Sequence, residues 1–546
     1  MYVIFKVPYL MNKNKVALER EILASIPRTL ALLDKNPYSK NFGSFDRKFW
    51  HYKIIDFSSG MQQELIYPLA YVWNTQFEGN SYYKNKRIEQ FIKGAFKKCA
   101  SISHADGSVD DYFPHERALG ATSYMLAAMT DTARLTNLHD TDDLQAMTKI
   151  GGFIADFQEA GTLSNHTAIA TFALFNLYLL NGDEKWKQTA NNLLEKLLAS
   201  QSKEGWFPEY EGCDLGYQTV TIEFLARAYR AGFHHPELRP ALERAISFVR
   251  QFLHPDGSFG GEYGSRNTYN FYIGGFALMQ ADNPDAQEFI FSFFKGMENG
   301  CQNYLVDDGV FQHMLSSYAV ALSDGSLEGK SWQPEYAIKP TVEIYQEAKL
   351  FIAKTGTLSV FGNLTKGGVF KVFDGDSLIA SDTGYILELS NGKIYCQNKA
   401  GSSNDESHDL TIQIRGKLKP FRIKSLTRIH MIGLRVLSLI FGRFTAYSHI
   451  IRRLMQAILI YDKDVSDISF FRQIEVSEHS IRLTEEITNN SGFSIKQMHR
   501  TTDCTNMHVV TSNSFQQANI LDWEKVDPTD NVYHFNRVYN GNAESL

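Results

Sequence analysis

Cysteine is scarce in this 546-residue chain, which has five cysteines, widely scattered and without a CxxC pair. This number and spacing exclude a disulfide framework and a zinc knuckle, and they favour a reducing compartment. Long apolar runs are also missing, since no stretch of about 18 uncharged apolar residues occurs, and we expect no membrane-spanning helix. Residues 1–15 lack a long apolar region followed by a small-residue cleavage site, so we expect no signal peptide and a cytoplasmic protein.

The chain has no excess of basic residues, because 55 Lys and Arg stand against 61 Asp and Glu. This balance argues against a nucleic-acid-binding protein. Residues 410–461 depart from it, with ten Lys and Arg, no Asp or Glu, and apolar runs such as 436–441. Such a basic amphipathic insertion, around 415–460, can bind an acidic polymer or lie on the anionic inner face of a membrane. It can also be ordinary strands or helices with a solvated basic face.

The first part of the chain has the pattern of repeated helical hairpins. Between about residues 15 and 350, apolar residues recur at helical spacing, as in 186–198 and 242–253. A short phrase with a central glycine returns between the helices, at Gly107, Gly161, Gly205, Gly257 and Gly309. A period near fifty residues holds two helices and two loops. It predicts an α/α toroid, an incomplete barrel of helical hairpins, over residues 1–354.

The rest of the chain changes to short β-rich runs separated by turn residues. The expected strands are 357–361, 368–373, 384–389, 393–397, 410–414, 468–476 and 480–487. We expect a helix from about Pro340 to Ala353 to lead into this part. The predicted fold is therefore a multidomain α+β protein, with an antiparallel β-sandwich domain over residues 355–546.

Polar residues gather after the recurring glycines, near the starts of the second helices of the repeats. They are His115, Arg117, Asn165, His166, Tyr217, Arg266, Asn267 and Tyr269. Equivalent positions in consecutive repeats become neighbours on one rim of a toroid, where helix N-termini favour bound anions. Trp206, in a connecting loop, is a candidate for stacking on a sugar ring. We therefore expect a rim that binds carboxylates.

Asn165 and His166 precede Tyr217 by about one repeat. This arrangement resembles the polysaccharide lyases of the heparinase II/III and oligoalginate lyase kind, in which an α/α toroid precedes an antiparallel β domain. The resemblance implies that Asn165 or His166 opens one toroid helix and that Tyr217, as the catalytic tyrosine, opens the next. It also implies that a histidine of the β domain, here His408, closes over the cleft. Some members hold zinc in that domain, but this chain offers only residues 407–409 there, so any zinc would be structural.

The same residue types suit β-elimination at a uronate. The proton on C5 becomes acidic once the adjacent carboxylate is neutralised by hydrogen bonds or positive charge, which Asn165 and His166 can supply. Tyr217, held near Arg or His cations, can take this proton and then protonate the leaving glycosidic oxygen. This chemistry requires no metal or other cofactor. The expected partner is an acidic polysaccharide or oligosaccharide.

A structural role is the alternative for every candidate residue. It would be a helix cap for His166, packing for Tyr217, a loop anchor for Trp206, a surface ion pair for Arg117 and Arg266, and a solvated turn for His408.

Three other functions remain open from the sequence. A uronate C5-epimerase would use the same residues, because it removes the same proton. A glycoside hydrolase could use paired carboxylates from the cluster Glu209, Glu211, Asp214 and Glu223. A non-catalytic glycan-binding protein would agree with residues 44–50, which look like segments of heparinase-like proteins associated with surface-polysaccharide synthesis. Among these functions we favour the lyase.

Overall fold

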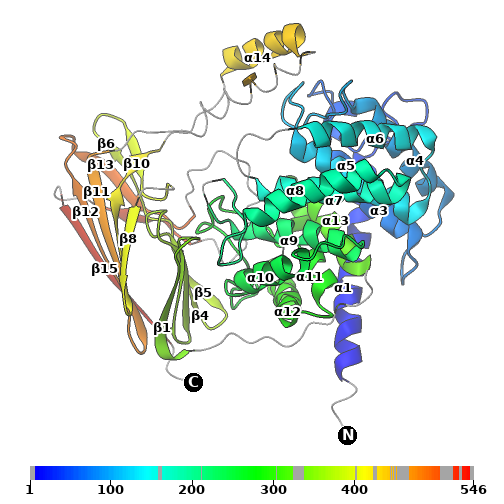
Figure 1. Cartoon of the computed structure of the whole chain (residues 1–546). Helices are drawn as coiled ribbons and strands as arrows, with labels where there is room; N and C mark the ends of the chain where they lie inside the picture. The colour runs from blue at the N-terminus through cyan, green and yellow to red at the C-terminus, as the bar shows by residue number, and fades with distance from the viewer. Residues whose placement is uncertain are drawn as a thin grey trace.

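The structure is a computed structural model in two halves, one helical and one made of sheets (Figure 1). It describes residues 6–157, 163–210, 212–302, 304–323, 327, 337–399, 403–421, 427–442, 444, 447, 450–451, 466–503, 521–527 and 532–541. Of residues 6–12, 337–338 and 403–407 it describes the backbone alone.

The helical half is a toroid of two concentric layers. Its elements are α1 (Lys6–Leu32), α2 (Arg47–Trp50), η1 (Met61–Leu65), α3 (Ile66–Asn74), α4 (Lys86–Ile102), α5 (Leu119–Thr136), α6 (Thr141–Asp156), α7 (Ser164–Asn181), α8 (Glu184–Ala199), α9 (Leu215–Arg230), α10 (Leu238–Arg250), α11 (Gly274–Met279), α12 (Pro284–Glu298), η2 (Tyr304–Val306) and α13 (Phe311–Ser323). Helices α3, α5, α7, α9, α11 and α13 pack in this order, and α13 returns to η1 and α3, so they form an inner ring. Helices α4, α6, α8, α10 and α12 each pack outside the inner helix that precedes them. The predicted α/α toroid is confirmed.

The recurring glycines have a steric cause. Gly107, Gly205 and Gly257 have φ angles of 93°, 108° and 86°, in the region that favours glycine. A Cβ atom at these positions would lie 2.3–2.5 Å from the backbone of the next outer helix, which is α6, α10 and α12 respectively. Each turn therefore lies directly against a helix of the following repeat, and only glycine leaves room for it. Gly161 lies outside the described residues.

The second half contains three five-stranded antiparallel sheets. The strands are β1 (Ala337–Tyr345), β2 (Leu350–Gly356), β3 (Leu358–Asn363), β4 (Phe370–Asp374), β5 (Ser377–Asp382), β6 (Tyr385–Leu389), β7 (Ile394–Cys396), β8 (Ser403–His408), β9 (Thr411–Lys417), β10 (Lys419–Pro420), β11 (Ile468–Val476), β12 (Ser480–Asn489), β13 (Ile495–Arg500), β14 (Glu524–Val526) and β15 (Val532–Asn540). Their orders are β1-β2-β3-β4-β5, β10-β7-β6-β13-β14 and β15-β12-β11-β9-β8. All seven strands expected from the sequence are present.

A buried ion network joins the three sheets. The guanidinium of Arg472 in β11 donates to Asp382 of β5 at 2.9 Å and to Glu485 of β12 at 2.6 Å. Arg500 of β13 donates to the other oxygen of Asp382 at 2.7 Å. Burial alone would raise the pKa of Asp382, but the two guanidiniums outweigh it and lower this pKa to about 2.

The helix expected over Pro340 to Ala353 is wrong, because these residues lie in β1, β2 and the turn between them. Tyr345 pairs with Leu350, and Lys349 in the turn has a φ of 57°. The ring centre of Tyr345 also lies 5.5 Å from that of Phe248 in α10 and 5.1 Å from that of Phe252, just after α10. Pairing and this distant aromatic contact decide the local structure, and the sheets begin at Ala337 rather than near residue 355.

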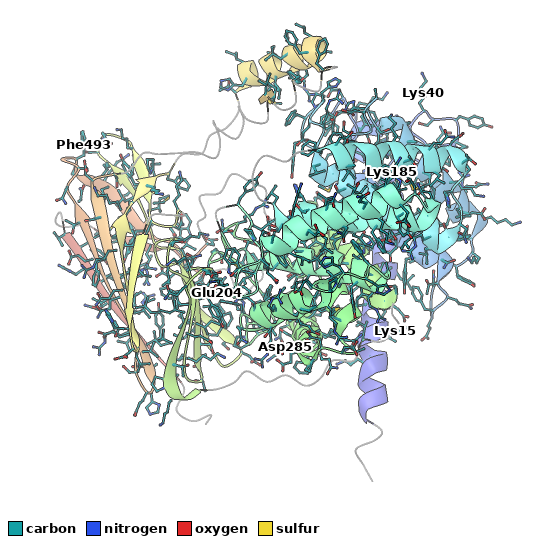
Figure 2. All side chains as sticks on the ribbon, in the orientation of Figure 1. Lys15, Lys40, Lys185, Glu204, Asp285 and Phe493 are labelled. Carbon is teal, nitrogen blue, oxygen red and sulfur yellow. The ribbon has the colours of Figure 1, made fainter. Side chains whose placement is uncertain are left out.

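The sheet β1–β5 packs against the toroid loop of residues 252–273. Lys366 donates from Nζ to the carbonyl oxygens of Glu262 at 2.6 Å and Gly264 at 2.8 Å, and also to the side chain of Asn267. Nearby, the carboxylate of Glu204 accepts from two backbone N–H groups of the β1–β2 turn, both at 2.9 Å. Figure 2 shows Glu204 at the boundary between helices and sheets. These contacts fix the two halves to each other.

Candidate active site

The first turn of α7 carries Asn165 and His166, and the loop before α9 holds it in place. Ser164 donates from Oγ to the carbonyl oxygen of Pro208 at 2.6 Å. The backbone N–H of Asn165 donates to Oε1 of Glu209 at 3.0 Å. The start of one inner helix is therefore bound to the loop that leads into the next, as the repeat pattern predicts.

Tyr217 lies in the first turn of α9, which is capped by Asp214. A carboxylate oxygen of Asp214 accepts from the backbone N–H of Tyr217 at 3.1 Å. The other oxygen accepts from the backbone N–H of Arg266 at 2.8 Å, and the hydroxyl of Thr268 also donates to this carboxylate. The Cζ atom of Arg266 lies 3.9 Å from the centre of the Tyr217 ring. Asp214 thus positions both the tyrosine and the arginine that covers it.

In this cluster, burial and the positive charge of Arg266 shift the pKa values of Tyr217 and Glu209 in opposite directions. Burial raises the pKa of the Tyr217 phenol, and the Arg266 guanidinium acts in the opposite direction. Burial also raises the pKa of Glu209 to about 7, although Arg266 Nη1 lies 3.6 Å from its Oε2. Close to neutral pH, therefore, Glu209 can be present as an acid that donates a hydrogen bond or as a carboxylate.

Three buried polar atoms of the cluster have no hydrogen-bond partner among the described residues. They are Oδ1 of Asn165, Oε2 of Glu209 and Nε of Arg266. Because buried polar groups in folded proteins are nearly always hydrogen-bonded, such a concentration indicates groups that bind water or a ligand. All three belong to residues that contact one another around Tyr217.

The side chain of His166 lies between α5 and the cluster around Glu209. Its imidazole lies over Gly120 in α5, where a Cβ atom would be 2.8 Å from Nε2. The charge of His166 also acts on Glu209, whose pKa it lowers. The structure therefore brings together Asn165, His166, Tyr217 and Arg266, as expected from the sequence, and adds Glu209, which the sequence suggested only for a hydrolase.

A second polar group on the inner helices was missed from the sequence. Glu64 of η1 is hydrogen-bonded to Nδ1 of His313 in α13, and the His313 ring lies 4.4 Å from the ring of Tyr124. Tyr124 is within electrostatic reach of both Glu64 and Tyr217. A signal was present, because His313 follows Gly309 just as the other rim residues follow their repeat glycines.

Asn267 and Tyr269, which were predicted to bind substrate, lie instead in the contact between toroid and sheet. Asn267 accepts from Lys366 through its side-chain oxygen. The hydroxyl of Tyr269 donates to Glu262 and accepts from Nζ of Lys371 at 3.0 Å. Their polar groups are used to join the two halves.

The predicted sugar-stacking Trp206 is buried, and its Nε1 donates to Glu204 at 3.2 Å. This contact makes it a loop anchor, the alternative role considered above. His115 stacks on His104 with ring centres 5.2 Å apart. Arg117 is buried and donates to Asp106, to Ser108 and to a backbone carbonyl of residue 442. The contacts of His115 and Arg117 thus stabilise the 104–117 loop.

His408 is exposed at the end of β8, where it pairs with Thr411. Strand β8 is the edge of the sheet β15-β12-β11-β9-β8, which lies on the far side of β1–β5 from the helices (Figure 1). The structure does not bring His408 to Tyr217, because β1–β5 is the sheet that contacts the toroid. Within the ranges that the structure describes, no group of three His, Cys, Asp or Glu side chains is arranged to hold a metal ion.

No protein-family model and no curated protein matches this sequence. Among solved structures, the chain is similar to the chondroitin AC lyase of Streptomyces coelicolor A3 in complex with chondroitin sulphate. The TM-score is 0.54 at 9% identity, over 88% of this chain and 67% of that one. The present chain has the fold of the heparinase-like polysaccharide lyases. The crystal structure of heparinase III gives a TM-score of 0.51 at 10% identity, over 91% of this chain and 77% of that one. At such identities the likeness concerns the fold.

Proposed function

We propose that this protein is a lyase that cleaves a uronic-acid-containing acidic glycan by β-elimination. The observation that carries the proposal is the convergence around Tyr217 of buried polar atoms of Asn165, Glu209 and Arg266 that make no hydrogen bond to the described residues. Nε of Arg266 and the protonated acid of Glu209 can donate hydrogen bonds to a sugar carboxylate, and Oδ1 of Asn165 can accept one from a sugar hydroxyl while its amide NH₂ group donates. The polysaccharide lyase fold supports the same reading.

In this proposal the carboxylate of the uronate lies against Asn165, His166 and protonated Glu209. Hydrogen bonds to the carboxylate stabilise the charge that develops when the C5 proton leaves, so they lower the barrier in the transition state. Tyr217 takes this proton as a phenolate, which the guanidinium of Arg266 stabilises at 3.9 Å from the ring. The phenol then returns the proton to the glycosidic oxygen as the bond to C4 breaks.

The carboxylate cluster gives less support to hydrolysis. Asp214 is occupied as the cap of α9 and as acceptor for the loop of Arg266. Glu223 accepts from Ser317 and lies 3.8 Å from Arg227, deep in the inner ring. An acid and a base flanking one glycosidic bond would need two available carboxyl groups, and the Tyr217 cluster offers Glu209. Glu211 lies outside the described residues.

The proposal is tested by incubating the full chain with a panel of uronate polymers and oligosaccharides in deuterated water. A lyase produces an ultraviolet-absorbing double bond between C4 and C5 as the chain is cut. Deuterium at C5 without scission would identify an epimerase that uses the same residues. New reducing ends without the double bond would identify a hydrolase and refute the elimination.

A further inference from the structure

Helix α14 (Arg428–Phe441) packs on the protein with one narrow face. Ser438 is 3% exposed and shares a hydrogen bond of 2.8 Å with the hydroxyl of Tyr447. At the C-terminal end of the helix, Gly442 lies so close to His115 that a Cβ atom would be 2.3 Å from its Cδ2. The helix is thus attached through Ser438, Gly442 and the ion pair of Arg435 with Asp56, whereas the opposite face is exposed.

The opposite face of α14 is apolar and exposed. The side chains share one helical stripe at spacings of three and four residues, and they are Ile429, Ile432, Val436, Leu439 and Ile440. Ile429 and Leu439 are 79% and 86% exposed, and the other three are between 47% and 64% exposed. Single exposed apolar residues are ordinary, but a continuous stripe of branched aliphatic side chains indicates an interaction surface.

The sequence on both sides of this stripe is basic. Residues 421–461 contain seven Lys and Arg and no Asp or Glu. On the helix itself, Arg428 begins the first turn, and Arg435 pairs with Asp56 at 2.7 Å. An aliphatic stripe flanked by basic residues on a helix of 14 residues matches the requirements of an interfacial membrane helix.

We propose that α14 docks this protein onto an anionic lipid surface, with the stripe Ile429–Ile440 inserted below the headgroups. Two copies of α14 facing each other would bring basic segments without acidic residues together, so charge disfavours a self-association surface. A glycan would need hydrogen-bonding groups, which the stripe does not supply. At about 1.5 Å per residue, a helix of 14 residues is too short to span a bilayer but can lie in its interface. Within the described residues, no helix has the length and apolarity required to cross a membrane.

Docking would also place the rim of the toroid close to the lipid. The carbonyl oxygen of Gly442 accepts from Nη2 of Arg117 at 3.2 Å, which ties α14 to the 104–117 loop. The same loop carries Tyr112, which is exposed and within electrostatic reach of Tyr217 and Arg266. A lipid-bound α14 would therefore hold the candidate active site near the membrane surface. The inference stands on α14 and does not require the proposed lyase reaction.

The test is co-sedimentation of the full chain with vesicles of phosphatidylcholine alone or mixed with phosphatidylglycerol. We expect binding to the mixed vesicles, weakened by salt, and a loss of about tenfold or more in affinity for the double variant Ile432→Ser and Leu439→Ser. The matched control is Ile379→Ser with Ile394→Ser, which removes two exposed isoleucines from the sheets and should leave binding unchanged. Circular dichroism confirms that both variants are folded.

Equal binding of the parent chain and the stripe variant would overturn the proposal, and so would equal binding to neutral and anionic vesicles. A parent chain that ignores both vesicles but dimerises through the stripe, as judged by sedimentation velocity, would assign the surface to a second copy instead. Failure of this test is distinct from failure of the lyase assay, because soluble oligosaccharides can be assayed without lipid.

Discussion

Glu209 provides a prediction that links burial directly to a measurable pH dependence. Its pKa is raised from an ordinary 4.5 to about 7, chiefly by burial. Since one pH unit corresponds to about 1.4 kcal/mol, ionising this group costs the native state about 3 kcal/mol. The native pKa lies above the unfolded one, so the native state is favoured fully below pH 4.5. This advantage is lost as the pH rises through 7.

The variant Glu209→Gln keeps the shape of the protonated side chain and cannot ionise. Between about pH 5 and about pH 8.5, we expect the parent chain to lose about 3 kcal/mol more of its free energy of unfolding than the variant does. Urea unfolding at the two pH values measures this difference. Glu195→Gln, on the exposed face of α8, is the matched control and should behave as the parent.

Identical pH dependences for the parent chain and Glu209→Gln would refute the assignment of a buried, neutral Glu209. Activity provides an independent measure, because a substrate carboxylate is bound by the protonated acid in our proposal. The parent chain should lose affinity for substrate as Glu209 ionises near pH 7, and the variant should not. A variant with the same alkaline loss of affinity would show that another group controls binding.

Three features give further predictions about stability: a repeat glycine, the buried ion network of the sheets and the contact between the two halves. Gly257→Ala should lower the free energy of unfolding by about 1–2 kcal/mol because of the positive φ, and by a further amount because the new Cβ clashes with α12. Gly182→Ala, at a φ of 70° with open space around it, should show only the loss that is due to φ. Equal melting temperatures of the two variants would contradict the close approach of Gly257 to α12. Arg472→Met leaves Arg500 as the single guanidinium beside the two buried carboxylates of Asp382 and Glu485 and should cost about 3–5 kcal/mol in urea unfolding. In the parent chain, protonation of Asp382 should destabilise the sheets as the pH falls from about 4 through about 2, because its native pKa is the lower one; acid unfolding that is complete above pH 4 would argue against this role. Lys366→Met removes the ammonium group that binds two carbonyl oxygens of the toroid. Limited proteolysis should therefore cleave the chain between the toroid and the sheets faster in this variant than in the parent. An unchanged cleavage rate would show that the other contacts between the two halves suffice.

The sequence predicted what depends on local repetition. The glycine period of about fifty residues reflects turns that press against the next outer helix, so it revealed the toroid and its rim. Asn165, His166 and Tyr217 are at helix starts one repeat apart, and the structure places them together with Arg266. The alternating apolar residues of β11 and β12 likewise identified these strands, since each pairs along its whole expected length.

Features that depend on distant contacts were not predictable in this way. Tyr345 belongs to a strand because of its pairing with Leu350 and its contact with α10, and neither is visible in the local pattern. Asn267 was assigned to substrate because its position in the repeat is equivalent to that of His166, but Lys366 reaches it from the sheet. His408 could be assigned to a cleft only by assuming which sheet faces the toroid. Tyr345 and Asn267 are each contacted by a residue about a hundred positions away, Phe248 and Lys366, and for His408 the order of whole sheets decides.

The most direct test of the account is the lyase assay on the variant Tyr217→Phe, run beside Tyr229→Phe at the other end of α9. If Tyr217 takes and returns the proton, the rate at which the ultraviolet-absorbing unsaturated product forms should be about 10²–10⁴-fold lower in Tyr217→Phe. Tyr229→Phe should retain the parent rate, and both variants should retain the parent far-ultraviolet circular dichroism. Undiminished product formation by folded Tyr217→Phe would contradict the central claim.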